Sequence, residues 1–151
     1  KDLIRGKDLL VKSILISKIN EIDRNNIKFS FECATKIDNL DKLVNPFDLS
    51  RIIGIAFDNA VEESKNNQIG EINAYIFQNG KTFTFEIRNK IKNIPQLSKI
   101  QQTGFSTKKN HQGLGLSNIN QLKQKYPTLF VNYRINNNWF IFTLNIVGVD
   151  E

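Results

Sequence analysis

Two short segments of the chain carry residue types suited to binding phosphate. Gly104-Phe105-Ser106-Thr107-Lys108 combines two hydroxyls and a lysine with a glycine, and the pair Gly113 and Gly115 follows soon after. A glycine pair that opens a helix lets backbone amides approach an anion at the positive end of the helix. Asn59 adds a neutral oxygen, which Mg²⁺ accepts when phosphate oxygens and waters complete its shell. These residue types allow the binding of a magnesium-bound phosphate compound.

Two common nucleotide motifs do not fit the chain. Gly80-Lys81-Thr82 resembles the end of a P-loop, but Tyr75 stands where the leading glycine is required, and strands are expected on both sides. The Gly113-Leu114-Gly115 segment resembles a dinucleotide fingerprint, but its third glycine position is Asn118. Neither motif is therefore predicted to operate here.

A longer ordered set of motifs gives a specific resemblance. It consists of four parts in sequence: Asp58-Asn59-Ala60-Val61-Glu62-Glu63, a strand ending in Asn89, the Gly104 to Lys108 segment, and His111-Gln112-Gly113-Leu114-Gly115-Leu116. This set resembles the ATP-binding domain of sensor histidine kinases in the GHKL ATPase superfamily, and it spans roughly residues 48–126. More narrowly, it is similar to the peptide-pheromone, quorum-sensing branch of these kinases.

The resemblance implies ATP and Mg²⁺ as ligands and assigns a role to each matching position. Asn59 corresponds to the asparagine that holds Mg²⁺, and Asn89 falls where an aspartate usually reads the adenine amino group. An amide oxygen can accept that hydrogen bond, but more weakly because it is uncharged. The remaining ATP-binding positions belong to the lid and to the helix that follows it: Gly104, Ser106, Thr107, Lys108, Gly113, Leu114, Gly115 and Leu116.

Three departures from the family pattern accompany these matches. Ile55 stands four residues before Asn59, where many relatives have a polar residue, so ATP hydrolysis is expected to be poor. The glycines that normally follow the adenine-binding position are missing from Asn89-Lys90-Ile91-Lys92-Asn93. Glu62 replaces a residue that is often basic, so Lys108 is expected to meet the phosphate charge.

The first half of the chain must supply the elements that position Asn59. Hydrophobic periodicity predicts a helix over 2–24, a half-buried strand over 27–33 and a polar connection over 36–47. A second amphipathic helix follows, and Asp48 or Ser50 is expected to cap it.

The second half is predicted to form two hairpins with a helix between them: strands at 71–78 and 81–88, a helix at 113–126, and strands at 128–134 and 139–146. The first hairpin turns at Asn79-Gly80 and the second at residues 136–138. This order of elements predicts a two-layer α/β sandwich. The resemblance specifies the Bergerat, or GHKL, version, a mixed sheet covered on one face by three helices.

Composition restricts the classes of protein to which the chain can belong. It has 151 residues, 40% of them hydrophobic and 24% charged, which is the profile of one globular domain. The net charge of +6 is scattered, and basic and aromatic residues do not interleave on one strand, so direct nucleic-acid binding is not expected. The single cysteine cannot form an internal disulfide, which indicates a reducing compartment. The chain has no methionine, so it is interpreted as a piece of a longer protein.

These expectations combine into one functional hypothesis with one rival. Residues 1–25 are interpreted as the tail of an upstream dimerisation segment, and 26–151 as an ATP-binding catalytic domain with its lid at 90–112. The domain is expected to transfer the γ-phosphate of ATP to a histidine on its own dimerisation domain, which lies outside this chain. A cognate response regulator is the second expected protein partner. The parent is expected to be a homodimeric plasma-membrane protein, with this domain in the cytoplasm. The rival hypothesis is a docking or scaffold module that binds nucleotide but has lost catalysis.

Overall fold

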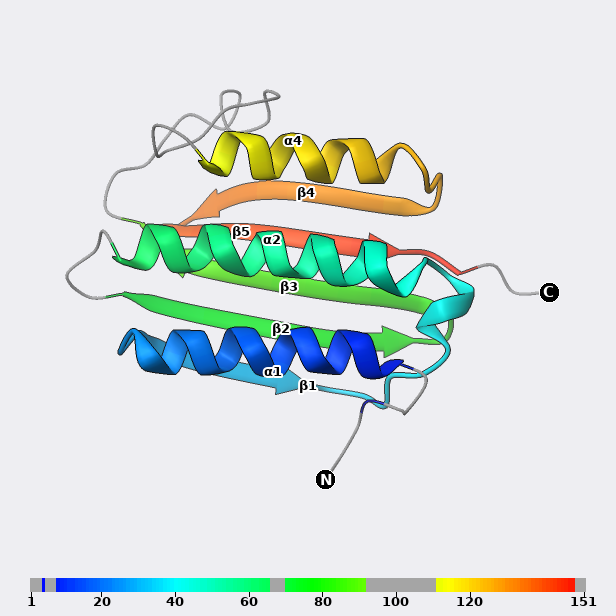
Figure 1. The fold of residues 1–151 in the computed structure, drawn as a ribbon, viewed down its shortest axis with the longest axis horizontal. Helices are drawn as coiled ribbons and strands as arrows, with labels where there is room; N and C mark the ends of the chain where they lie inside the picture. The colour runs from blue at the N-terminus through cyan, green and yellow to red at the C-terminus, as the bar shows by residue number, and fades with distance from the viewer. Residues whose placement is uncertain (1–3, 5–7, 66–69, 92–110, 149–151) are drawn as a thin grey trace.

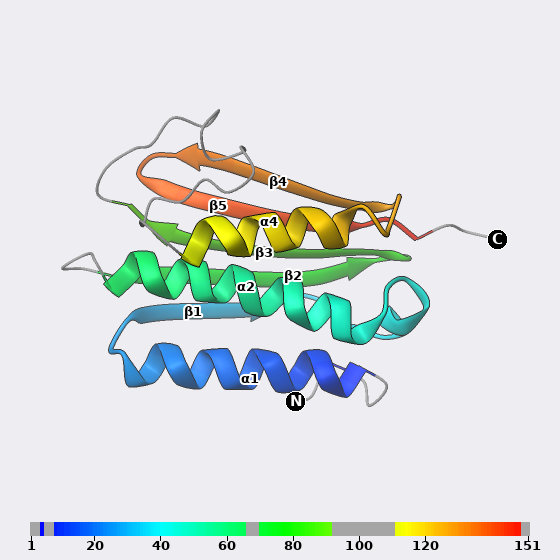
Figure 2. The ribbon, with the colours of Figure 1, turned by 45° about the horizontal axis from the view of Figure 1, so that its top comes forward.

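The computed structural model describes residues 4, 8–65, 70–91 and 111–148, without the side chains of 111–116. In chain order its elements are α1 (Leu9–Arg24), β1 (Lys28–Cys33), a 3₁₀ turn η2 (Leu40–Lys42), α2 (Pro46–Lys65), β2 (Glu71–Asn79), β3 (Thr82–Lys90), α4 (His111–Lys123), β4 (Leu129–Asn136) and β5 (Trp139–Ile146). The strands form one sheet in the order β1-β2-β3-β5-β4. Only the β1–β2 pair is parallel. The three α-helices lie on one face of this mixed sheet, which confirms the predicted two-layer α/β sandwich (Figure 1; Figure 2).

The strands follow the alternation that their sequences predict. In β1 the side chains of Lys28, Ser30 and Glu32 are exposed, and the residues between them are half-buried. In β3 every second residue is buried, beginning at Phe83. Because successive side chains of a strand point to opposite faces, this pattern gives the sheet one face packed against helices and one face toward solvent.

Helix α2 forms the centre of the helical layer, between α1 and α4 (Figure 1). It connects the parallel strands β1 and β2, a pairing that requires a crossover of this kind. The ring of Phe57 is fully buried, and its centroid lies 6.4 Å from that of Phe29 and 5.8 Å from that of Phe85. The core therefore lies between α2 and the middle of the sheet. No helix in the described part of the chain is both long and apolar enough to cross a membrane.

The start of α2 differs from the prediction. Asn45 and Pro46 were expected in a connection, but Pro46 is the first helical residue, and Asn45 Oδ1 accepts a hydrogen bond of 2.8 Å from the Phe47 amide. Proline suits this position because the first helical residue needs no amide hydrogen, and asparagine is a favoured cap. Asp48 and Ser50, the predicted caps, lie inside the helix instead.

Both hairpins are present, with two-residue turns. Asn79 pairs with Thr82, so the first turn consists of Gly80 and Lys81 rather than Asn79 and Gly80, and Gly80 has a φ of 61°. In the second hairpin Asn136 pairs with Trp139. The turn residues Asn137 and Asn138 have φ values of 50° and 68°, as a type I′ turn requires.

Helix α1 begins later than predicted. Its first residue is Leu9, not Asp2, and two described residues before it make contacts outside this helix. Ile4 forms a parallel bridge with Ile37, and the buried carboxylate of Asp8 accepts a hydrogen bond of 3.1 Å from the Leu40 amide. The interpretation of residues 1–25 as the tail of a dimerisation segment remains a prediction.

Candidate functional site

Three of the predicted site segments lie at the same end of the sheet. The C-terminal part of α2, the end of β3 and the beginning of α4 meet there (Figure 1). These segments carry Asn59, Asn89 and the pair Gly113 and Gly115. The fold therefore gathers residues that are up to 56 positions apart in the sequence, from Asn59 to Gly115.

Asn59 lies on the half-buried flank of α2 rather than on its core face. The preceding residue, Asp58, is turned toward α1, where its Oδ1 lies 2.6 Å from Lys18 Nζ. Burial opposes the charge on Lys18, but the hydrogen bond and the charge of Asp58 outweigh it, and the pKa of Lys18 is raised. Because successive helical residues are about 100° apart, Asn59 is rotated away from α1.

Asn89 is the polar member of an otherwise apolar row. It shares the core face of β3 with Phe83, Phe85 and Ile87, and its side chain is only 2% exposed. Its Nδ2 donates a hydrogen bond of 3.3 Å to the Lys90 carbonyl. This bond gives the buried amide a polar partner within the chain. The adenine-reading role of Asn89 stays a prediction.

The predicted phosphate-binding helix begins two residues earlier than expected. Helix α4 starts at His111, so Gly113 is its third residue and Gly115 its fifth. The first four amides of a helix have no partner within the helix and carry its positive partial charge. The amides of residues 111–114, which include Gly113, therefore fit an anion, whereas the Gly115 amide is paired within the helix. The side chains of Leu114 and Leu116, and all of Gly104, Ser106, Thr107 and Lys108, lie outside the described residues.

The donor set also fits a magnesium ion held mainly by phosphate. Asn59 supplies an amide oxygen, a hard neutral ligand, on the flank of α2 beside the predicted nucleotide site. In the described segments of the chain, no cluster of three or more His, Cys, Asp or Glu side chains is placed to hold a metal. A single amide ligand suits Mg²⁺, which retains waters and shares phosphate oxygens.

A polar cluster at the opposite end of α2 and α4 was not identified from the sequence. The Tyr126 hydroxyl donates a short hydrogen bond to Asp48 Oδ2, and Lys125 Nζ lies 3.1 Å from the same oxygen. The Asn45 amide donates to the Tyr126 hydroxyl at 3.3 Å. The hydrogen bond from Tyr126, with the Lys125 contact, outweighs burial and lowers the pKa of Asp48. Burial, together with Asp48, raises the pKa of Tyr126.

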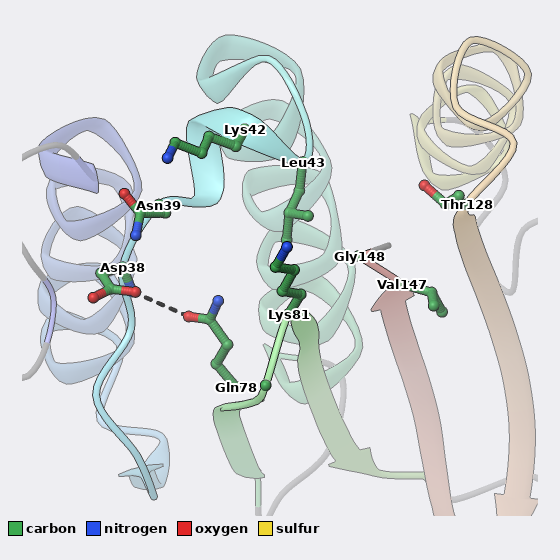
Figure 3. Close-up of a pocket in the computed structure, with 10 residues that line it drawn as sticks. Asp38, Asn39, Lys42, Leu43, Gln78, Lys81, Thr128, Val147 and Gly148 are labelled. Atoms are coloured by element: carbon green, nitrogen blue, oxygen red, sulfur yellow. Dashed lines mark hydrogen bonds between the residues drawn. The ribbon is translucent and has the colours of Figure 1, made fainter. Parts of the chain in front are cut away.

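A cavity of about 560 Å³ also lies away from the predicted nucleotide site. It is bounded by the connection after β1, the β2–β3 turn and the segment after β5, at the end of the sheet opposite Asn89 (Figure 3). Gln78 Oε1 accepts a hydrogen bond of 3.0 Å from the Asp38 amide in its wall. The exposed lysines Lys42 and Lys81 line its rim. Of the predicted ATP-binding residues that the structure describes, neither Asn59 nor Asn89 lines this cavity.

Comparison with known proteins connects this arrangement to one family. The family model described as GHKL domain matches residues 44–147, well over half of the chain. Sensor protein CitS of Bacillus subtilis (strain 168) is 24% identical over 111 residues, which cover 72% of this chain. The matched part is only 20% of the length of CitS.

Solved structures of histidine kinases share the fold. The catalytic domain of histidine kinase ThkA has a TM-score of 0.71 at 20% identity, covering 91% of this chain and 89% of that one. Acinetobacter baumannii histidine kinase AdeS has a TM-score of 0.65 at 15% identity, covering 91% and 62%. Mycobacterial sensor histidine kinase MprB has a TM-score of 0.64 at 17% identity, covering 89% and 92%. The chain therefore belongs to the GHKL domain family and has the fold of histidine kinase catalytic domains.

Proposed function

We propose that this chain is the ATP-binding catalytic domain of a sensor histidine kinase, which transfers the γ-phosphate of ATP to a histidine on a separate dimerisation domain. One observation carries the proposal: in a GHKL fold, Asn59, the buried Asn89 and the first turns of α4 lie at one end of the sheet. Phosphoryl transfer depends mainly on positioning and on charge stabilisation. The domain therefore needs no nucleophile of its own.

Each residue has a defined task in this proposal. Asn89 accepts a hydrogen bond from the adenine amino group, and the first-turn amides of α4 receive the phosphates. Asn59 holds Mg²⁺, which neutralises charge on the phosphate oxygens when it is bound. Lys108 is assigned the role of neutralising phosphate charge, because Glu62 stands at a position that is often basic in the family.

Ile55 is expected to make the domain a poor ATPase. It lies one helical turn before Asn59 and packs, half-buried, against the core. An aliphatic side chain cannot accept a proton from water, so this position cannot activate water for attack on ATP. Poor hydrolysis would preserve ATP for transfer to the histidine.

The wider cellular setting belongs to the same proposal. CitS is a sensor protein, and ThkA has been solved in complex with the response regulator protein TrrA. By analogy, the partners proposed for this chain are its own dimerisation domain and a response regulator. The parent is proposed to be a homodimer in the plasma membrane with this domain in the cytoplasm. The motifs of the chain most resemble those of the quorum-sensing kinase AgrC, and the setting proposed for it is two-component quorum-sensing signalling.

The rival function is a nucleotide-binding docking module without catalysis. Asn89 favours it to a limited degree, because an amide binds the adenine amino group less strongly than a carboxylate does. ATP affinity and phosphate transfer separate the two functions.

The direct test replaces the proposed magnesium ligand. Asn59→Ala should abolish Mg²⁺-dependent ATP binding in calorimetric titration and leave the fold intact, because Asn59 lies on the flank of α2 and not in its core stripe. Asn20→Ala is the matched control, since Asn20 is an exposed asparagine on α1. Unchanged ATP affinity in folded Asn59→Ala would contradict the assignment of the metal ligand. Absence of ATP binding by the unmodified chain would contradict the proposed function.

A further inference from the structure

We infer that Tyr126 is a positioning residue for the nucleotide site, although it lies at the opposite end of α4. Through its hydrogen bonds to the beginning of α2, it fixes the placement of α4 and therefore of the unpaired amides of residues 111–114, which include Gly113. The inference rests on the proposed function, because it assigns those amides to the phosphates of ATP.

The contacts of Tyr126 join two elements that are distant in the sequence. Its hydroxyl donates to Asp48 Oδ2 and accepts from the Asn45 amide, across a separation of 78 residues from Asp48. Lys125 Nζ contacts the same carboxylate oxygen at 3.1 Å. Asn45 is also the cap of α2, and Asp48 lies in the first turn of α2. The tyrosine is therefore attached to the capped first turn of the central helix.

The contact between Tyr126 and Asp48 and the proposed nucleotide site are separated by the same number of residues on both segments. Asp48 and Asn59 are 11 positions apart on α2, and Gly115 and Tyr126 are also 11 positions apart. Eleven helical residues make about three turns, so Asp48 and Asn59 lie on nearly the same side of α2. Helices α2 and α4 run in opposite directions (Figure 1). Tyr126 lies three residues beyond the end of α4, so fixing it against Asp48 holds the start of α4 at the end of the sheet that carries Asn59 (Figure 1).

The described side chains of α4, those of residues 117–123, include two that are buried in the core, Ile119 and Leu122. The ring of Tyr126 packs against the edge of the same core. The two buried side chains lie within one turn of each other, so they oppose sliding of this part of the helix more than a tilt about them. The polar contacts of Tyr126 add a point of attachment that opposes this tilt.

A small tilt is sufficient to disturb phosphate binding. Gly113 lies about 9 Å along the helix from Ile119, at about 1.5 Å per residue. A rotation of about 6° about Ile119 would move the Gly113 amide by about 1 Å, which is enough to break a hydrogen bond of ordinary length. Loss of the Tyr126 hydroxyl should therefore weaken ATP binding, although Tyr126 does not contact the proposed nucleotide site.

The test measures ATP affinity in a set of variants of the full chain. Tyr126→Phe retains the ring and should weaken Mg²⁺-ATP binding about tenfold in calorimetric titration. Asp48→Ala should do the same, whereas Asp48→Asn, which keeps an acceptor for the tyrosine, should remain within about threefold of the unmodified chain. Because both residues act through one contact, the double variant Tyr126→Phe/Asp48→Ala should lose no more than either single variant. Tyr133→Phe, which changes a tyrosine without a hydroxyl partner, is the control.

Hydrogen exchange of the α4 backbone distinguishes this inference from the proposed function. Faster exchange at the start of α4 in Tyr126→Phe, together with unchanged exchange in β3, is the expected result without nucleotide. Equal ATP affinity and equal exchange in Tyr126→Phe and the unmodified chain would overturn the inference and leave the proposed function intact. An equal loss of affinity in Asp48→Asn and Asp48→Ala would also overturn it, because it would show that charge and not the tyrosine contact matters. If the unmodified chain binds no ATP, the proposed function fails.

Discussion

Two buried polar side chains of the sheet, Asn89 and Tyr133, differ in their hydrogen-bond partners. Asn89 and Tyr133 are both on the core face, and they are 2% and 8% exposed. The Asn89 amide hydrogen-bonds to the backbone at the end of its strand, where the nucleotide site is proposed. The Tyr133 hydroxyl has no partner and lies among aromatic rings. Burial raises the pKa of Tyr133, so the phenol stays neutral.

Tyr133→Phe should leave the free energy of unfolding unchanged or raise it by up to about 1 kcal/mol. The substitution removes a hydroxyl that loses its water on folding without gaining a partner, and it keeps the ring that packs against Phe140 and Phe142. Urea denaturation of both proteins measures the difference. A loss above about 1 kcal/mol would show that the hydroxyl has a stabilising contact.

At the residue scale, sequence patterns predict the candidate site residues but contain no signal for residues that act through tertiary contacts. Asn59 and Asn89 were recognisable because they occur in an ordered set of motifs. Asp48 was interpreted as a helix cap, although its partners are Tyr126 and Lys125. A contact across 78 residues has no local periodicity, so a single sequence contains no signal for it.

At the scale of elements, strands and turns were predicted better than helix starts. The hairpin turns follow from local backbone preferences at Gly80, Asn137 and Asn138, which take positive φ angles. The start of α1 instead depends on the contact of Asp8 with Leu40, a residue in a later turn. Helix starts set by such contacts do not follow from periodicity.

Gly54→Ala should stabilise the domain by about 1 kcal/mol. Gly54 lies inside α2, where glycine is unfavourable relative to alanine. An added Cβ would meet side-chain atoms of Ile14 at 3.6 Å and of Lys18 at 3.8 Å, which are ordinary van der Waals distances. The helices α1 and α2 therefore have room for a methyl group. Thermal unfolding measures the effect.

Gly80→Ala provides the contrast to that substitution. An added methyl group meets no atom within 4 Å at Gly80, but the φ of 61° disfavours alanine. This variant should be destabilised despite the open space. A decrease in stability for Gly54→Ala would indicate instead that the close packing of α1 on α2 requires glycine.

At the scale of the whole molecule, the order and pairing of the strands could not be predicted from hydrophobic periodicity. Alternation and helical spacing predict the order of elements, but they do not state that β1 pairs in parallel with β2 or that β5 lies between β3 and β4. The mixed sheet was expected from the resemblance to a family. The same topology brings Asn59, Asn89 and the start of α4 together, so the site could be predicted only to the extent that the family was recognised.

The topology also limits what this chain can phosphorylate by itself. Its single histidine, His111, is the first residue of α4, next to the proposed phosphate-binding amides. A residue in the wall of the phosphate site is badly placed for the in-line approach that phosphoryl transfer requires. The isolated chain should therefore bind ATP without labelling itself.

Incubation with radiolabelled ATP, alone and with a dimerisation fragment of the parent kinase that carries its phosphoacceptor histidine, tests this expectation. The chain alone should remain unlabelled, and the added fragment should be labelled in trans. The rate should increase with the concentration of either component, because encounter replaces the effective concentration of about millimolar that a tether provides. Asn59→Ala, as the matched control, should abolish transfer. Stable phosphate on His111, or no transfer to the fragment despite measurable ATP binding, would contradict the kinase function and favour the docking module.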